Sequence, residues 1–225
     1  MRMKKLVKCV ISLPKSIYFC FRYLPVAQAI RIPILIAYDT RITQMRGGGV
    51  SINAENISPA MIHIGMFDGS FDCGRNIRTT LQLQKGSNLI FNGRAAIARG
   101  AVINNAGVVE FGNNFSSNFG LFISCSKRIA FGNSCLLGWN NHFLDNNGHT
   151  ILDNIGNATS SPEEIKIGNN VWITSETHFL SGSAIGDGCV VGYKSFVLKD
   201  FSYIERGLIA GSPSKVLREN ITWKK

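Results

Sequence analysis

The sequence predicts an all-β fold, a parallel β-helix of six-residue repeats that follows a short, basic, helical N-terminal segment and ends in a short tail. Three observations indicate this fold. Apolar residues recur at a constant spacing of six, and glycine and asparagine occur only in the part of the chain that carries the repeat. No long stretch of that part has the period of about 3.6 residues that marks an amphipathic helix.

The composition changes near residue 46. All 23 glycines lie at or after Gly47, and every asparagine lies at or after Asn53. Residues 1–31 carry seven basic side chains and no acidic one, so they supply most of the formal net charge of +10. We therefore expect three parts: a basic, apolar segment at 1–46, the β-helix at 47–205 with a loop at 144–165, and a C-terminal tail at 206–225.

The N-terminal segment predicts short helices rather than a membrane-spanning one. A spanning helix needs about 20 apolar residues without charge. Here four basic residues and three prolines interrupt every apolar run, namely Lys8, Lys15, Arg22, Arg31, Pro14, Pro25 and Pro33. A secretory signal is not indicated either, because Lys8 splits the apolar region and no small-residue cleavage site follows.

Two interpretations of residues 1–46 remain open. The short helices cover the end or flank of the β-helix, or the segment makes a peripheral contact with an anionic membrane surface. The side chains that would enter the membrane are Ile17, Tyr18, Phe19, Phe21, Tyr23 and Leu24. Both interpretations can hold together. Nucleic acid is not an expected partner, because no nucleic-acid-binding motif accompanies the basic charge.

The cysteines indicate a cytoplasmic protein. The six residues are Cys9, Cys20, Cys73, Cys125, Cys135 and Cys189. No two of them form a CxxC pair, so neither a zinc ribbon nor a redox dithiol is predicted. Reduced, buried thiols fit a cytoplasmic location, and the N-terminal segment leaves open a peripheral position at the inner face of the membrane.

The repeat is clearest between Ile165 and Val197. One apolar column has a constant spacing of six: Ile167, Ile173, Phe179, Ile185, Val191 and Val197. A second column lies four residues further on and is small or β-branched: Val171, Thr177, Ser183, Cys189 and Ser195. Runs with the same spacing precede it: Phe91, Ile97, Ile103 and Val109, then Phe131, Leu137 and Phe143.

Each hexad corresponds to one short strand and one turn. The strand points its aliphatic residue inward, the small residue fits the corner, and Gly and Asn supply the unusual backbone angles there. Three hexads close a triangular coil, and stacked coils bury a continuous apolar column. The region from Gly47 to about Asp200 has room for about seven or eight coils. A β-sandwich would instead show alternation with wider turn spacing.

Four motifs in the last third of the chain carry a family resemblance. They are IGNNVWI at 167–173, IGDG at 185–188, VVGYKSFVLKD at 190–200 and GSPSKVLR at 211–218. These motifs resemble the C-terminal half of the hexapeptide-repeat acyltransferases. The resemblance implies a left-handed β-helix, acetyl-CoA as co-substrate, no metal, and a homotrimer with sites between subunits. The N-terminal stretch is similar to that of surface-polysaccharide biosynthesis enzymes within the family.

The same resemblance implies a catalytic histidine. In LLGWNNHFLDNNGHTILD at 136–153, His149 stands where the family motif D-x-D-G-H-x-I has its general base. Asp145 matches the first acid, and Asn147 stands at the second, so Asp145, Asn147 or Asp153 is expected to orient the imidazole. Histidine titrates near neutrality and can accept the proton of a hydroxyl that attacks a thioester. Asn140 or Asn141 is an expected oxyanion donor.

The remaining site residues follow from the position of the motifs. His142 precedes an inward Phe143, so alternation directs it outward, where it lines the cleft or contacts substrate. The resemblance lays coenzyme A along the coils near Trp172, Thr174, Gly192 and Tyr193, with basic groups for its phosphates at Lys199, Lys215 and Arg218. Thr174 replaces a usual glycine, and Tyr193 with Lys194 replaces Ala-Gly.

The function that these observations predict is acetyl-CoA-dependent O-acetylation of a sugar in a capsular, exopolysaccharide or lipopolysaccharide precursor. Three alternatives stay open. N-acylation of an amino sugar would use the same base and donor site. A γ-carbonic-anhydrase-like enzyme would need three convergent histidines on zinc, from His142, His149 and His178. A non-catalytic scaffold would use the loop at 144–165 as a binding surface.

Overall fold

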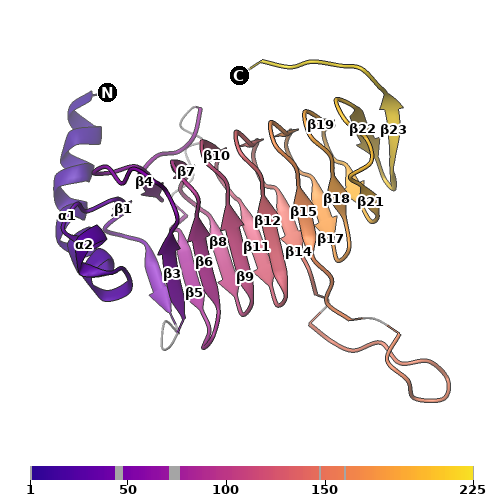
Figure 1. Ribbon diagram of the computed structural model, residues 1–225, viewed down its shortest axis with the longest axis horizontal. Coiled ribbons are helices and arrows are strands. Elements are labelled where there is room, and N and C mark those ends of the chain that lie inside the picture. The colour runs from indigo at the N-terminus through magenta and orange to yellow at the C-terminus, as the bar shows by residue number, and fades with distance from the viewer. Residues whose placement is uncertain (1, 44–47, 71–76, 147, 160, 225) are drawn as a thin grey trace.

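The computed structural model describes residues 2–43, 48–70, 77–146, 148–159 and 161–224 (Figure 1). Side chains are described from residue 6 onward. Within these ranges the chain forms two helices, α1 (Arg2–Tyr23) and α2 (Val26–Ala29), and three β-sheets. The predicted left-handed parallel β-helix is confirmed, with the helices at one end of the coil stack.

The sheets form the three faces of a triangular prism. Within the described residues, sheet A contains β1 (Ile34–Ile36), β4 (Ile62–Ile64), β7 (Ala95–Ile97), β10 (Phe115–Ser117), β13 (Leu136–Leu137), β16 (Trp172–Ile173), β19 (Val190–Val191), β22 (Leu208–Gly211) and β23 (Ser214–Arg218). Sheet B contains β2 (Arg41–Thr43), β5 (Thr80–Leu83), β8 (Val102–Asn105), β11 (Phe122–Cys125), β14 (His142–Leu144), β17 (His178–Leu180) and β20 (Phe196–Val197). Sheet C contains β3 (Gly49–Ile52), β6 (Asn88–Phe91), β9 (Val108–Phe111), β12 (Arg128–Phe131), β15 (Ile165–Ile167), β18 (Ala184–Ile185) and β21 (Asp200–Phe201).

The strand order follows the coils. Each strand pairs in parallel with the strand three positions later in the chain, and the described pairs depart from this only in the antiparallel hairpin of β22 and β23. Sheets B and C each have seven strands in the described part of the chain, which gives seven coils, within the expected range.

The interior consists of the columns that the spacing of six predicted. Ile167, Ile173, Phe179, Ile185, Val191 and Val197 are all at most 2% exposed. Aromatic rings of successive coils stack along the axis. The ring centroids of Phe111 lie 5.4 Å from Phe91 and 5.5 Å from Phe131, and those of Phe143 and Phe179 lie 4.6 Å apart. Burial of this continuous apolar column is the main stabilising term of the solenoid.

A ladder of side-chain oxygens fixes the register at one corner. The oxygens of Asn113, Asn133, Asn169 and Asp187 each accept the backbone N–H of the preceding coil at 2.7–2.9 Å. A glycine precedes each of these four residues, because a side chain at that position would collide with the next coil. A Cβ on Gly112 would lie 2.4 Å from the backbone of the next coil. The Gly-Asn pairs of the sequence therefore act as corner residues.

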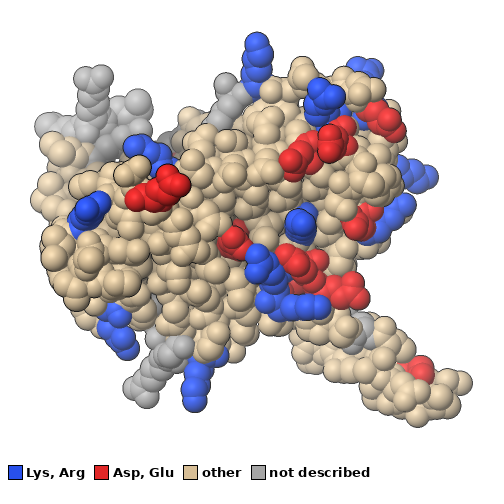
Figure 2. Space-filling view, viewed as in Figure 1, with Lys and Arg blue, Asp and Glu red and all other residues tan. Residues whose placement is uncertain are grey.

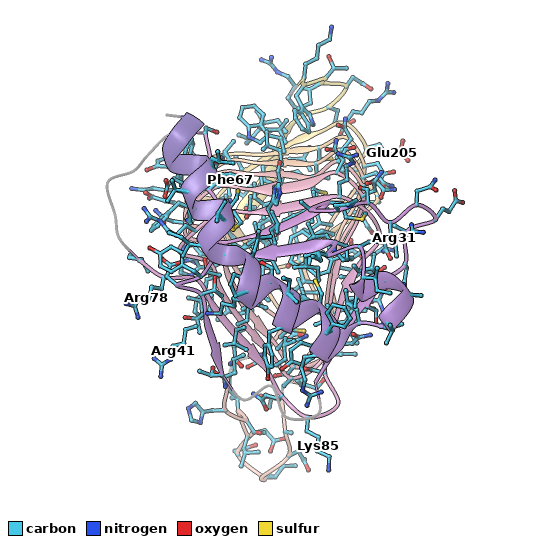
Figure 3. The ribbon with its side chains drawn as sticks, turned by 90° about the vertical axis from the view of Figure 1, so that its left-hand side faces the viewer. Arg31, Arg41, Phe67, Arg78, Lys85 and Glu205 are labelled. Carbon is cyan, nitrogen blue, oxygen red and sulfur yellow. The ribbon has the colours of Figure 1, made fainter. Side chains whose placement is uncertain are left out.

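Helix α1 lies across the open end of the prism (Figures 1 and 3). Phe19 is fully buried there and Leu24 is 6% exposed, so the membrane insertion considered for these two side chains is wrong. Both belong to the same hydrophobic cluster as Ile34 of β1. The predicted packing of the N-terminal segment on the end of the β-helix is therefore present for this face of the helix.

Two serines of α1 accept hydrogen bonds from backbone N–H groups at the free edge of sheet A. The backbone N–H of Ile36 donates to Ser16 Oγ at 3.0 Å, and that of Tyr38 donates to Ser12 Oγ at 3.0 Å. The ammonium groups of Lys8 and Lys15 add bonds to carbonyls, 2.9 Å to Gly65 in the first case. An unpaired strand edge invites association with other chains, and α1 covers it.

Replacing Ser16 with alanine is expected to lower the free energy of unfolding by about 1–3 kcal/mol, because the buried N–H of Ile36 loses its acceptor. Urea unfolding followed by circular dichroism measures this loss. A change within the error of the measurement would show that water replaces the hydroxyl and that α1 is not a sealed cap.

Among the described residues, no helix combines the length and the hydrophobicity that a membrane crossing requires.

The described cysteines are free thiols, and Cys20, Cys125, Cys135 and Cys189 are buried, as predicted. Cys73 lies outside the described residues.

Candidate functional site

A long loop leaves the prism at the corner between β14 of sheet B and β15 of sheet C (Figure 1). Leu152 and Ala158 form an antiparallel bridge within it. The carboxylate of Asp153 accepts the N–H groups of Ile155 at 2.9 Å and Asn157 at 2.8 Å. The loop therefore folds on itself as a small hairpin with an exposed tip, and Asp153 serves that hairpin.

Asp145 anchors the base of the loop. Its carboxylate is fully buried and accepts three backbone N–H groups of the adjacent coil, from Ser126 at 2.6 Å and from Lys127 and Arg128 at 2.8 Å each. The pKa of the neighbouring Cys125 thiol is raised, first by burial and then by this carboxylate. These bonds give Asp145 a structural role, and the orienting role predicted for it stays a prediction. Asn147, the other candidate, lies outside the described residues.

His149 lies just beyond this anchor and is exposed. It lines an open pocket of about 250 Å³. The other lining residues are polar or small: Ser126, Asn146, Gly148, Thr150, Ser161, Pro162 and Ser181. Gly148 has φ of 71°, a left-handed conformation that directs the chain into His149. Within the described part of the chain, no group hydrogen-bonds the imidazole, and its side chain is exposed at the pocket.

His142 and His178 stand on the outer face of sheet B, as alternation predicted. Their ring centroids are 4.7 Å apart, and Phe122 stacks on His142 at 5.2 Å. The pKa of His142 is lowered by burial and, to a smaller extent, by His178. A neutral imidazole in an aromatic ladder suits a packing surface, so the substrate contact predicted for His142 stays a prediction.

The two asparagines before His142 serve a corner of the prism. Asn141 is fully buried; its Nδ2 donates to the carbonyl of Thr174 at 2.8 Å, and its Oδ1 accepts the N–H and the hydroxyl of Thr177. Asn141 therefore holds this corner together, and the substrate contact predicted for it stays a prediction. Asn140 has a left-handed φ of 55° in the turn and is partly exposed.

The predicted coenzyme A residues fall on three parts of the prism. Thr174 and Gly192 directly follow β16 and β19, and Ala210 is the residue of β22 in register with them; the three form one line along the corner between sheets A and B, which we call the ledge. A Cβ on Gly192 would lie 2.6 Å from that of Ala210, so this part of the ledge is flat. Lys215 pairs with Ala210 at its end, and Tyr193, 59% exposed, stands beside it.

The other predicted donor residues lie away from the ledge. Trp172 stands on the outer face of sheet A, in a line that ends at Arg218. Its ring lies 6.0 Å from that of Trp223, whose indole N–H donates to the carbonyl of Asn170. Lys199 lies at the corner between sheets B and C, with its ammonium 5.3 Å from the Phe201 ring.

The ledge and His149 therefore occupy different corners of one chain. The width of sheet B separates them, about 10 Å for the three residues of β14. This separation was not predicted, because the sequence order does not show on which corner a residue lies until the coils are closed.

The curated proteins to which the chain is similar in sequence are acetyltransferases. No protein-family model matches the chain. The galactoside O-acetyltransferase of Escherichia coli (strain K12) is 37% identical over 114 residues, which are 49% of this chain and 54% of that protein. The chain resembles the hexapeptide-repeat acyltransferases. A chloramphenicol acetyltransferase of Agrobacterium fabrum is 28% identical over 112 residues, 42% of this chain and 53% of that protein.

The solved structure of the polySia-specific acetyltransferase NeuO matches 86% of this chain and 79% of its own, with a TM-score of 0.51 and 19% identity. This likeness confirms the fold that the resemblance to the hexapeptide-repeat acyltransferases implied.

The chain spans about half the length of the first two relatives above, 54% and 53%. Among the described residues, no three His, Cys, Asp or Glu side chains are grouped as metal ligands.

Proposed function

We propose that the protein is an acetyl-CoA-dependent O-acetyltransferase that modifies a sugar hydroxyl. The observation that carries this proposal is the exposed His149, held over an open polar pocket by a loop whose base Asp145 fixes. A free imidazole in this position is the general base that acyl transfer from a thioester requires. The identity with galactoside O-acetyltransferase supports the same reaction class.

In the proposed reaction, His149 accepts the proton of the sugar hydroxyl while the hydroxyl oxygen attacks the thioester carbonyl. A C–O bond forms, the C–S bond breaks, and the thiolate of coenzyme A takes up a proton. Precise placement of the two substrates supplies much of the rate. The amide nitrogen of the buried Asn141 already donates to the carbonyl of Thr174, so oxyanion stabilisation falls to backbone N–H groups or to Asn140.

The ledge fits an extended donor. Thr174, Gly192 and Ala210 present no long side chain, so a pantetheine arm has room along this corner. Lys215 at its end and Arg218 three residues later provide positive charge for phosphates. Trp172, Gly192 and Tyr193 remain proposed donor contacts. Lys199 lies at the corner that carries the His149 loop, and we assign it to the acceptor side.

The sites are proposed to lie between copies of the chain in a homotrimer. The ledge and His149 are on different corners of one chain, so a donor on the ledge of one copy meets the base from another. The half-buried aromatic ladder of sheet B, which includes Phe122 and His142, lies between the two corners and is the proposed contact face.

The acceptor is proposed to be a sugar of a surface polysaccharide or its precursor. A relative in Escherichia coli (strain K12), WbbJ, is named as a candidate lipopolysaccharide biosynthesis O-acetyl transferase; it is 27% identical over 132 residues, 53% of this chain and 66% of that protein. The open pocket lined by hydroxyl side chains suits a polar acceptor. Because the donor is a cytoplasmic metabolite and the described thiols are free, we propose a cytoplasmic reaction.

Release of free thiol from acetyl-CoA tests this function. Purified protein is incubated with acetyl-CoA and a panel of sugars and extracted polysaccharides, and the product is analysed by mass spectrometry. Acceptor-dependent thiol release with an ester in the product is the expected result. An amide product would favour N-acylation of an amino sugar. No release with any acceptor, together with no binding of coenzyme A, would contradict the proposal and favour a scaffold.

A further inference from the structure

The outward side of α1 is an apolar surface. Seven apolar residues of α1 are between 41% and 65% exposed, Ile11 among them, and we call the other six the outer face of α1: Leu6, Val7, Val10, Ile17, Tyr18 and Phe21. At 3.6 residues per turn they occupy one arc of about 120° in which no charged residue falls. Val26 and Ile30, 65% and 66% exposed, continue this surface past the helix.

This surface is an unusual place for apolar side chains. Helix α1 already buries Phe19 and Cys20 against the first coil, so its stability does not require a second apolar side. Exposed apolar patches of this extent mark sites that bind a protein or a membrane. At the other end of the prism, Tyr203 after β21 and Leu217 of β23 are exposed singly, which offers a contrast.

The charge around the outer face of α1 is basic. Residues 1–31 contain seven basic side chains and no acidic one. Arg22 is exposed beside the face, and Figure 3 shows Arg31 on one side of α1 and Arg41 and Arg78 on the other, all directed outward. Most of the acidic side chains visible in Figure 2 lie over the later coils and the loop instead. Asp39, the acid nearest in sequence, lies among Lys15, Arg41 and Arg78 around a shallow pocket.

We propose that the outer face of α1 docks the protein on an anionic lipid bilayer, with the helix lying in the plane of the membrane surface. The apolar arc enters the boundary between headgroups and acyl chains, and the arginines at its border pair with lipid phosphates. Ser16 and the lysines bind the other side of α1 to the β-helix, so the helix stays on the prism while it docks. This inference does not rest on the proposed function.

The position of α1 also predicts how the protein is oriented on the membrane. Because α1 crosses the end of the coil stack, docking stands the prism upright on the membrane (Figure 1). The loop with His149 leaves the prism several coils away from that end, so it stays in water. A site several coils above the membrane would suit an enzyme that modifies the headgroup of a lipid-linked sugar.

Sedimentation with vesicles tests the proposal. Wild-type protein is expected to bind vesicles of phosphatidylcholine with about 30% phosphatidylglycerol and to bind pure phosphatidylcholine weakly. The double variant Val10→Gln with Phe21→Gln is expected to lose at least about tenfold in affinity. Tyr203→Gln with Leu217→Gln, matched in exposure at the opposite end, is expected to bind as wild type. Thermal unfolding checks that both variants are folded.

Tyr18→Trp gives a second readout, since Trp139, Trp172 and Trp223 all lie in the later coils or the tail. Its fluorescence is expected to shift to the blue on anionic vesicles and to be quenched by lipids with brominated acyl chains. Equal binding by wild type and the α1 double variant would overturn the proposal. So would concentration-dependent self-association that this variant abolishes without any vesicle binding, since the occupant would then be a second copy of the chain.

Discussion

Replacing His149 with alanine is expected to lower kcat for acetyl transfer by about 10²–10⁴-fold, the usual contribution of a general base. The imidazole is exposed in the pocket and makes no hydrogen bond within the described residues, so the substitution removes the base and leaves the fold intact. Acceptor-dependent thiol release, measured at saturating acetyl-CoA, gives kcat, and the binding of coenzyme A is expected to be unchanged.

Thr150→Ala is the matched control, because Thr150 is exposed at the same pocket and carries no base. It is expected to keep kcat within about threefold of wild type. A His149→Ala protein with the kcat of wild type would remove this residue from the mechanism, whatever the substrate proves to be.

Replacing Asp145 with alanine is expected to lower the free energy of unfolding by about 3–5 kcal/mol. The buried carboxylate accepts three backbone N–H groups of the neighbouring coil, and all three would be left without an acceptor. Asparagine is expected to destabilise as well, since its amide N–H₂ would face those N–H donors. Urea unfolding of the variants measures the loss.

Asp153→Ala provides the comparison for Asp145. Asp153 belongs to the same loop, but its bonds to Ile155 and Asn157 are exposed to water. Only a small change in global stability is expected there. If both variants were equally stable, Asp145 would not be the anchor of the loop, and an orienting role toward His149 would regain support.

Much of the fold follows from residue spacing. The columns of Ile173 and Thr177 point inward because one strand and one turn use six residues, and this relation holds wherever the spacing is kept. The contact of α1 with the edge of sheet A did not follow in the same way. Ser12 and Ser16 are ordinary polar residues in the sequence, and their task depends on where β1 ends.

The site was less predictable than the fold. The family motif singles out His149, but it does not say that Asp145 faces into the prism rather than toward the imidazole. The bonds of Asn141 to Thr174 and Thr177 were not predicted either, because a corner side chain and a cleft side chain have the same sequence signal. The stacking of Phe122 on His142 depends on which residues the coils bring into register, and a single hexad does not contain that information.

The most direct test of the central claim combines two inactive variants. His149→Ala removes the base, and Ala210→Trp obstructs the ledge on another corner of the same chain. If each site takes its base from one copy and its ledge from the next, a trimer co-refolded from equal amounts of both variants has about a quarter of its sites intact. The predicted result is therefore about a quarter of wild-type acetyl transfer, although each variant alone is inactive. No recovery above the separate variants, with mixed trimers shown to form, would contradict a site built between copies around His149.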